Sequence, residues 1–237
     1  MFSQKCLKIL LTTSALLWMS CALCQIQTEG KLAESGKIKV KALPHAAEWV
    51  NTPKDFKILA DDSFSITAAK ETDLYNSADG GAPVATAPML LFSAEETFVL
   101  TAAVSVDFKQ EYDGGFLVIY ADPQHWVKLL LEKSHYGPVS VCSSVTNIFS
   151  DDSVNSYISS NQVFLRLTRA KDVFGFYYSL DGKEWKYIRY FNFVAKGALK
   201  VGFASQSPLG QQTVAVFSKI RYSSNKASEF WSGEPKE

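Results

Sequence analysis

The stretch "FYYSLDGKEWKYIRYF", residues 176–191, decides the fold that we predict for this chain. Its centre, Asp181-Gly182, separates two runs that are rich in aromatic side chains. An Asp-Gly pair favours a two-residue turn because both turn positions take positive φ angles. Aromatic pairs across such a hairpin stabilise a sheet by up to about 1 kcal/mol each. We therefore predict a β-hairpin with three facing pairs: Leu180 with Lys183, Tyr178 with Trp185, and Phe176 with Tyr187.

The centre of this stretch, residues 179–185, also resembles the Asp-box of some sugar-cleaving propellers. A propeller carries its box several times, whereas this chain has it once, and the glycine stands in a different relation to the aspartate. The turn alone accounts for the motif, so the hairpin is the favoured interpretation.

Short runs of period two, rich in β-branched and aromatic residues, continue through the chain and predict further strands. Turn dipeptides such as Asp113-Gly114 and Gly137-Pro138 separate them. About ten strands without crossover helices predict an all-β fold, an antiparallel two-sheet β-sandwich, with a barrel as the alternative. The expected strands are Phe64–Ala68, Phe98–Phe108, Gly115–Ala121, Trp126–Lys133, Val139–Val145, Val163–Ala170, Val173–Leu180, Glu184–Phe191, Leu199–Ala204 and Thr213–Tyr222.

Residues 1–24 have the pattern of a secretory signal peptide, with a short basic region, an apolar run and then small residues. Cleavage after Cys24 or after Ala22 fits this pattern. Lipidation of Cys21 and a buried N-terminal helix are alternatives. We expect a protein that is secreted, periplasmic or exposed at the cell surface.

The rest of the chain divides into one domain and two polar segments. Residues 25–41 are polar and mixed in charge, which predicts a linker. Residues 224–237 are polar apart from Phe230 and Trp231, which predicts a polar tail after a domain at 42–223. No transmembrane span is expected within that domain, because no apolar run there is long enough.

The net charge limits the classes of binding partner, and the cysteine content limits the disulfides that can form. Without residues 1–24 the chain has 22 basic and 24 acidic side chains. This balance argues against nucleic acid, which requires a basic surface. Only Cys142 would remain, so we expect no internal disulfide and a small buried apolar side chain at this position.

The strand "HWVKLLLE", residues 125–132, gives the sharpest candidate site. With period two, an aromatic side chain and two opposite charges share one face, and the alternate positions are apolar. Sugar sites combine aromatic rings with charged and amide groups. The alternative is a solvated or salt-bridged sheet face. We predict a semi-polar sheet face bearing the candidate ligand-binding residues Tyr120, Trp126, Lys128, Glu132 and Arg166.

A second candidate is the loop "TDLYNSADGG", residues 72–81. Asp73, Tyr75 and Asn76 precede its glycines, and binding residues are common on such loops. The alternative is an Asx-type turn with no function beyond local conformation.

No cofactor is expected from the sequence. The three histidines lack the spacing of a zinc motif, and the acidic pairs Asp61-Asp62 and Asp151-Asp152 leave calcium as an alternative. The evidence for catalysis is weak. Glu132 has no second acid on its strand, as a glycosidase of this architecture would require, and there is no nucleophile elbow or phosphate loop.

Four segments in order resemble the DUF1349 family, whose fold is a concanavalin A-like jelly-roll sandwich and which includes a yeast protein linked to enolase regulation. They are "EWVNTPKDF" (48–56), "TDLYNSADGG" (72–81), "YDGGFLVIYADPQHWVKLLLE" (112–132) and "FYYSLDGKEWKYI" (176–188). The chain departs from the family pattern at Gly114, Gly115 and Leu130. The resemblance implies no settled activity. Related sandwiches accompany glycoside hydrolases, which implies glycan binding by analogy.

We therefore predict a non-catalytic module that binds a glycan or glycoconjugate. The alternatives are a glycoside hydrolase that uses Glu132, or an accessory domain of glycan breakdown, and an envelope protein that contacts a protein partner through the segment around Trp231.

Overall fold

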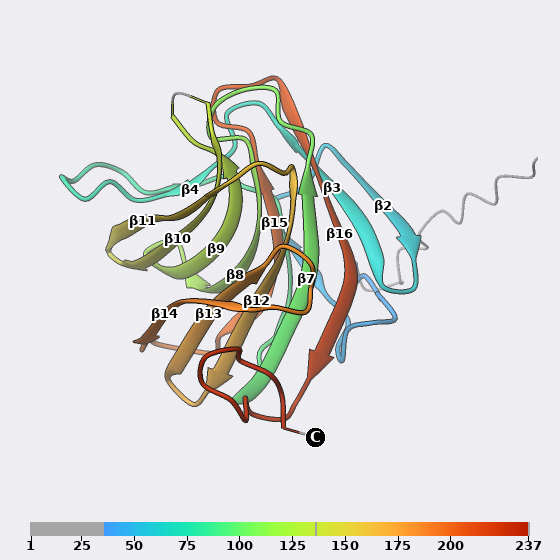
Figure 1. Cartoon of the computed structure of the whole chain (residues 1–237). Helices are drawn as coiled ribbons and strands as arrows, with labels where there is room; N and C mark the ends of the chain where they lie inside the picture. Colours follow the sequence, from blue (N-terminus) through green and yellow to red (C-terminus); the bar gives the residue numbers. More distant parts are fainter. Residues whose placement is uncertain (1–35, 136, 237) are drawn as a thin grey trace, which may run out of the picture.

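The computed structural model describes residues 36–135 and 137–236. The predicted signal peptide at 1–24 and the alternative lipid anchor at Cys21 lie outside these residues. The described residues form sixteen strands, and fourteen of them build two antiparallel sheets that pack face to face (Figure 1). This arrangement confirms the predicted all-β sandwich.

The first sheet has seven strands. In spatial order they are β1 (Glu48–Val50), β6 (Met89–Ser93), β15 (Lys200–Gln206), β8 (Gly114–Asp122), β9 (His125–Lys133), β10 (Val139–Asn147) and β11 (Phe149–Ile158).

The second sheet also has seven strands, and a short ribbon stands apart from both sheets. The second sheet runs β14 (Lys186–Asn192), β13 (Val173–Ser179), β12 (Gln162–Ala170), β7 (Thr97–Val106), β16 (Gln212–Ser223), β3 (Ser63–Ala69) and β2 (Asp55–Ala60). The ribbon pairs β4 (Leu74–Tyr75) with β5 (Val84–Ala85).

The core forms because successive side chains of a strand point to opposite faces. On β9, Val127, Leu129 and Leu131 enter the sandwich interior. Trp126 and Leu130 join a second apolar cluster, which includes Phe116 and Leu74, on the other face of the same sheet. The loop that carries β4 lies over this outer face (Figure 1).

The hairpin around Asp181-Gly182 exists, but its predicted register is wrong. Tyr178 pairs with Lys186, not with Trp185, and a bulge follows at Phe176. Asp181 Oδ1 accepts the backbone N–H groups of Lys183 and Glu184, so the turn is longer than two residues. This longer turn lifts Trp185 out of the strand pairing.

The predicted linker at 25–41 is also corrected in its last part. Ile38 pairs with Ala47, and both Ile38 and Val40 are buried in the main core. Two apolar side chains in a mostly charged segment are enough to dock it on the sandwich.

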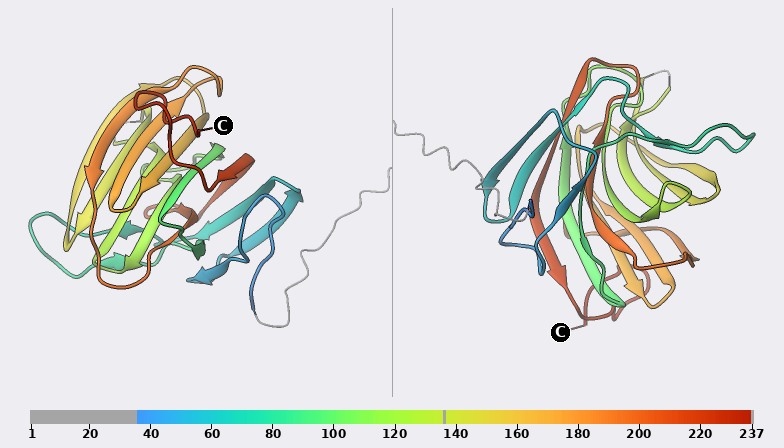
Figure 2. Two further views of the ribbon diagram at one scale, coloured as in Figure 1. Left: turned by 90° about the horizontal axis from the view of Figure 1, so that it is seen from below. Right: turned by 180° about the vertical axis from the view of Figure 1, so that it is seen from behind.

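The polar tail folds back on the second sheet and does not extend from it (Figure 2). Tyr177 donates a hydrogen bond to the Phe230 carbonyl oxygen at 2.8 Å, and Tyr187 packs against Phe230 and Trp231. Among the described residues no helix is long and apolar enough to cross a membrane.

Candidate functional site

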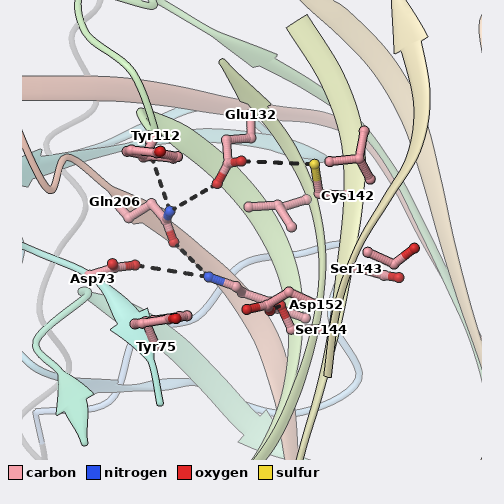
Figure 3. A pocket seen from close by; sticks show the side chains of 13 residues that line it. Asp73, Tyr75, Tyr112, Glu132, Cys142, Ser143, Ser144, Asp152 and Gln206 are labelled. Atoms are coloured by element: carbon pink, nitrogen blue, oxygen red, sulfur yellow. Dashed lines mark hydrogen bonds and ion pairs between the residues drawn. The ribbon is translucent and has the colours of Figure 1, made fainter. Parts of the chain in front are cut away.

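A pocket of about 460 Å³ opens on the face of the first sheet that is turned away from the second sheet (Figure 3). The floor comes from β9 and β10, and β11, the β4 loop and the end of β15 contribute to the walls. It is lined by Asp73, Tyr75, Tyr112, Lys128, Leu130, Glu132, Cys142, Ser143, Ser144, Asp152, Ser153, Val154 and Gln206.

Strand pairing explains why polar groups meet on this floor. On β9 and β10 the register sets Lys128 opposite Ser144 and Glu132 opposite Ser140. The two charged side chains of the pocket floor therefore each have a serine beside them on β10, whereas the alternate positions, such as Leu129, face the sandwich interior.

Lys128 is a buried cation at the base of the pocket. Its Nζ donates hydrogen bonds to the Leu74 carbonyl oxygen at 2.7 Å and to Gln206 Oε1 at 3.2 Å. Asp73 Oδ1 lies 3.9 Å from the same nitrogen. These groups replace the water that burial removes from the ammonium group.

Glu132 completes a polar chain that runs through Gln206. Gln206 Nε2 donates to the Tyr112 carbonyl oxygen at 3.0 Å and lies 3.4 Å from Glu132 Oε2 (Figure 3). Burial raises the pKa of Glu132 to about 7, although the nearby Lys128 charge acts in the opposite direction. Glu132 therefore exchanges its proton near neutral pH.

Cys142 faces Glu132 from β10. Its Sγ lies 3.8 Å from Glu132 Oε1 and 3.2 Å from Ser140 Oγ. Burial raises the pKa of the thiol to about 12. Cys142 is therefore a protonated, weak donor in this pocket and not a nucleophile at neutral pH.

The β4 loop brings two predicted residues to the rim. Asp73 is held by backbone contacts: its N–H donates to Thr86 Oγ1, and its carbonyl oxygen accepts the N–H of Ala87. Tyr75 lines the pocket and remains accessible. Asn76 lies elsewhere, because its buried amide donates to the carbonyl oxygens of Pro123 and Ile148 and anchors the loop.

Three other predicted residues are not brought to the pocket. Trp126 is fully buried and Tyr120 nearly so, and both belong to the apolar cluster beneath the β4 loop. Arg166 lies on β12 of the second sheet, so the prediction that placed it on one face with Lys128 is wrong. The sequence shows which side chains of a strand share a face, but it does not show to which of the two sheets the strand belongs.

Several lining residues were missed by the sequence reasoning. Gln206 stands two positions after Ala204 at the end of a predicted strand, and its polar side chain on that face was a usable signal. Ser144 lies on the opposite face of its predicted strand from Val141 and Val145, which is a signal of the same kind.

The acidic pairs would have to supply the oxygen ligands of the calcium alternative. In residues 36–135 and 137–236, no group of three or more His, Cys, Asp or Glu side chains is arranged to hold a metal ion. Asp61 pairs with Lys41, Asp151 with Arg189, and Asp152 accepts a hydrogen bond from Ser144. The calcium alternative stays a prediction.

The sequence matches the family described as "Protein of unknown function (DUF1349)" over residues 49–225. The chain belongs to the DUF1349 family. No curated protein matches this DUF1349 chain in sequence. The match includes the pocket floor and all of β1 to β16 except the first residue of β1.

Solved structures share the fold of this DUF1349 protein. A functionally unknown protein from Saccharomyces cerevisiae is 23% identical, with a TM-score of 0.69, and the match covers 75% of this chain and 96% of that one. A mutant of the GH43 protein BlXynB from Bacillus licheniformis is 16% identical, with a TM-score of 0.57, over 74% of this chain.

The xylan beta-1,4-xylosidase from Bacillus halodurans is 16% identical, with a TM-score of 0.53, over 73% of this chain. This chain matches only 36% of BlXynB and 38% of the xylosidase. At these identities the likeness shows a common sandwich fold and does not extend to activity.

Proposed function

We propose that the pocket on the first sheet binds a carbohydrate or glycoconjugate, and that the protein is a secreted, non-catalytic binding module. The observation that supports this best is the polar chain from Asp73 through Lys128 and Gln206 to Glu132 on the floor of an accessible pocket. Sugar hydroxyls both donate and accept hydrogen bonds, so they suit a floor where carboxylates alternate with an ammonium and an amide.

The walls of the pocket offer surface for the apolar face of a sugar ring. Tyr75 and Tyr112 line the pocket and supply apolar ring surface, which the C–H face of a pyranose prefers. The volume falls within the range of small-molecule sites. The sandwich shared with a GH43 protein and with a xylan beta-1,4-xylosidase supports the proposal by analogy.

Binding to a panel of polysaccharides and oligosaccharides, on arrays and by calorimetry, tests the proposal. We expect Tyr75→Ala to weaken the best ligand by about tenfold, or about 1.4 kcal/mol, because a stacking surface is lost. Tyr157→Ala is the matched control, since Tyr157 is exposed on β11 of the same sheet but does not line the pocket. Absence of binding by every sugar, or equal binding in both variants, would contradict the proposal.

The same panel distinguishes binding from hydrolysis. A protonated Glu132 has the pKa of a general acid, which favours a glycoside hydrolase as the second candidate. If the protein releases reducing sugar and the Glu132→Gln variant does not, the protein is a glycoside hydrolase and not a non-catalytic binding module. We expect no release.

A further inference from the structure

A second hollow, of about 790 Å³, lies on the outer face of the second sheet beside the C-terminal tail. The tail folds back next to β12 and β13 (Figure 1), and Glu234 from the tail reaches the hollow. We call this hollow the tail groove. Arg166, Trp185, Lys183, Lys219, Arg221 and Glu234 are among the residues that line it.

Arg166 is the central group of the tail groove. Its guanidinium is almost completely buried and stacks on the Trp185 ring, with its Cζ 3.6 Å from the ring centroid. Nε donates to Thr101 Oγ1 at 3.2 Å, and Nη1 donates to the Ser232 carbonyl oxygen at 2.6 Å and to Glu234 Oε1 at 2.8 Å. Within the described residues Nη2 makes no hydrogen bond, so this arginine has donors left for a ligand.

The tail groove has an excess of positive charge. Lys183, Lys219 and Arg221 line it, and none of them forms an ion pair with another described residue. Asp181 is engaged by backbone N–H groups of its own turn. Glu234 is therefore the acid that neutralises the buried guanidinium, and several cations around it have no anion.

A second, independent observation indicates a missing acceptor. Trp185 Nε1 is buried and has no hydrogen-bond partner among the described residues. An orphaned buried N–H is costly unless a ligand or water accepts from it. Trp185 lines the tail groove, so a ligand bound there is a candidate acceptor for this hydrogen bond.

The acid that now occupies the site is replaceable. The Glu234 side chain is half exposed, and it lies in a tail beyond the family match at 49–225. A ligand carboxylate on Arg166 would replace the ion pair between Arg166 and Glu234 by an ion pair between Arg166 and the ligand. It would leave no buried charge without a partner.

We propose that the tail groove is a binding site for a small carboxylate-bearing ligand, and that Glu234 occupies the carboxylate position until such a ligand displaces it. The volume falls within the range of small-molecule sites. The carboxylate could belong to a uronic acid or to an aliphatic polycarboxylate, and the charge pattern serves both. This site is independent of the pocket on the first sheet.

Calorimetric titration of the protein with glucuronate, citrate and glucose tests the proposal. We expect a carboxylate to bind and neutral glucose not to bind. Tighter binding of glucuronate would identify an acidic sugar, and tighter binding of citrate a polycarboxylate. Glu234→Gln should bind the same carboxylate at least about fivefold more tightly, because the apparent affinity rises with the fraction of open sites.

Two further variants complete the test. Arg221→Gln should weaken binding, because it removes a cation that lines the tail groove. Glu184→Gln is the matched control: it removes a charge from the turn at Asp181, but Glu184 does not line the groove, so affinity should stay within about twofold. The proposal is overturned if Glu234→Gln binds no carboxylate at millimolar concentration, if it binds no more tightly than wild type, or if glucose binds equally well.

Discussion

Glu132 and Lys128 are two charged residues of one strand that face a pocket and not bulk water. Gln206 links the two side chains by hydrogen bonds. Its amide oxygen accepts from Lys128, and its amide nitrogen donates toward Glu132. Burial nevertheless dominates the protonation of Glu132. A binding site at this position therefore combines a buried lysine with an acid whose charge depends on pH.

At the residue scale, Glu132 should make stability depend on pH. Its pKa rises from an ordinary 4.5 to about 7 in the folded protein. Between these values the folded state holds a proton that the unfolded chain has released, so stability falls as the pH rises through this window. We expect Tm to fall from pH 5 to pH 8, and Glu132→Gln to reduce that fall.

Thermal unfolding at several pH values measures the effect. Glu71→Gln removes an exposed acid and should keep the wild-type slope. An unchanged slope in Glu132→Gln would show that other groups control the pH dependence.

At the scale of elements, the close packing of β15 against β6 depends on one glycine. A Cβ at Gly202 would lie 2.0 Å from the Leu90 carbonyl oxygen of the neighbouring strand. Backbone cannot move aside as a flexible side chain can, so the two strands would have to separate.

Gly202→Ala should therefore lower the free energy of unfolding by at least about 2 kcal/mol, as overpacking does. Lys200→Ala, at the start of the same strand, removes only a partly exposed ion pair with Glu48 and should cost less than about 1 kcal/mol. Urea unfolding of both variants measures the difference. Similar losses in the two would mean that the strands adjust without strain.

Elements also show how far sequence reasoning extends. Ten strands were predictable because their side chains alternate, and Phe64 to Ala68 is one such run. β6 was missed because "MLLFS" is apolar on both faces, and β11 because "FSDDSVNSYI" is polar on both. Local patterns do not identify strands whose faces are alike.

The candidate site was predictable only in part, for a related reason. Period two placed Lys128 and Glu132 on one face without the structure. Gln206 and Tyr112 come from other strands and loops, and only the tertiary pairing brings them near Glu132. Trp126 shares the predicted face but is covered by the β4 loop, which strand periodicity cannot show.

At the scale of the whole molecule, each sheet has on its outer face a hollow that includes charged side chains, and the interior between the sheets is apolar. The two hollows lie on opposite sides of the sandwich. The segment before β1 also belongs to this body, because Ile38 and Val40 enter its core.

A chain that begins at Ala42 should therefore be less stable than one that begins at Gly36, by at least about 2 kcal/mol, because two buried apolar side chains are lost. The double variant Ile38→Ala with Val40→Ala should reproduce most of this loss, and Lys39→Ala, an exposed neighbour, should not. Chemical unfolding compares the four proteins. If the chain that begins at Ala42 is as stable as the one that begins at Gly36, the contacts of Ile38 and Val40 contribute little to stability.

The polarity of β11 has a consequence for the molecule in a crowded solution. In the order of the first sheet β11 is the last strand, so within the part of the chain that the structure describes one row of its backbone groups has no neighbouring strand. Such a row is a template on which a second copy can add a strand and start aggregation. Asp151 and Asp152 place two carboxylates on this edge, where a second copy would bring like charges together. The polar composition that made β11 hard to predict from the sequence should thus also disfavour the addition of a strand from a second copy.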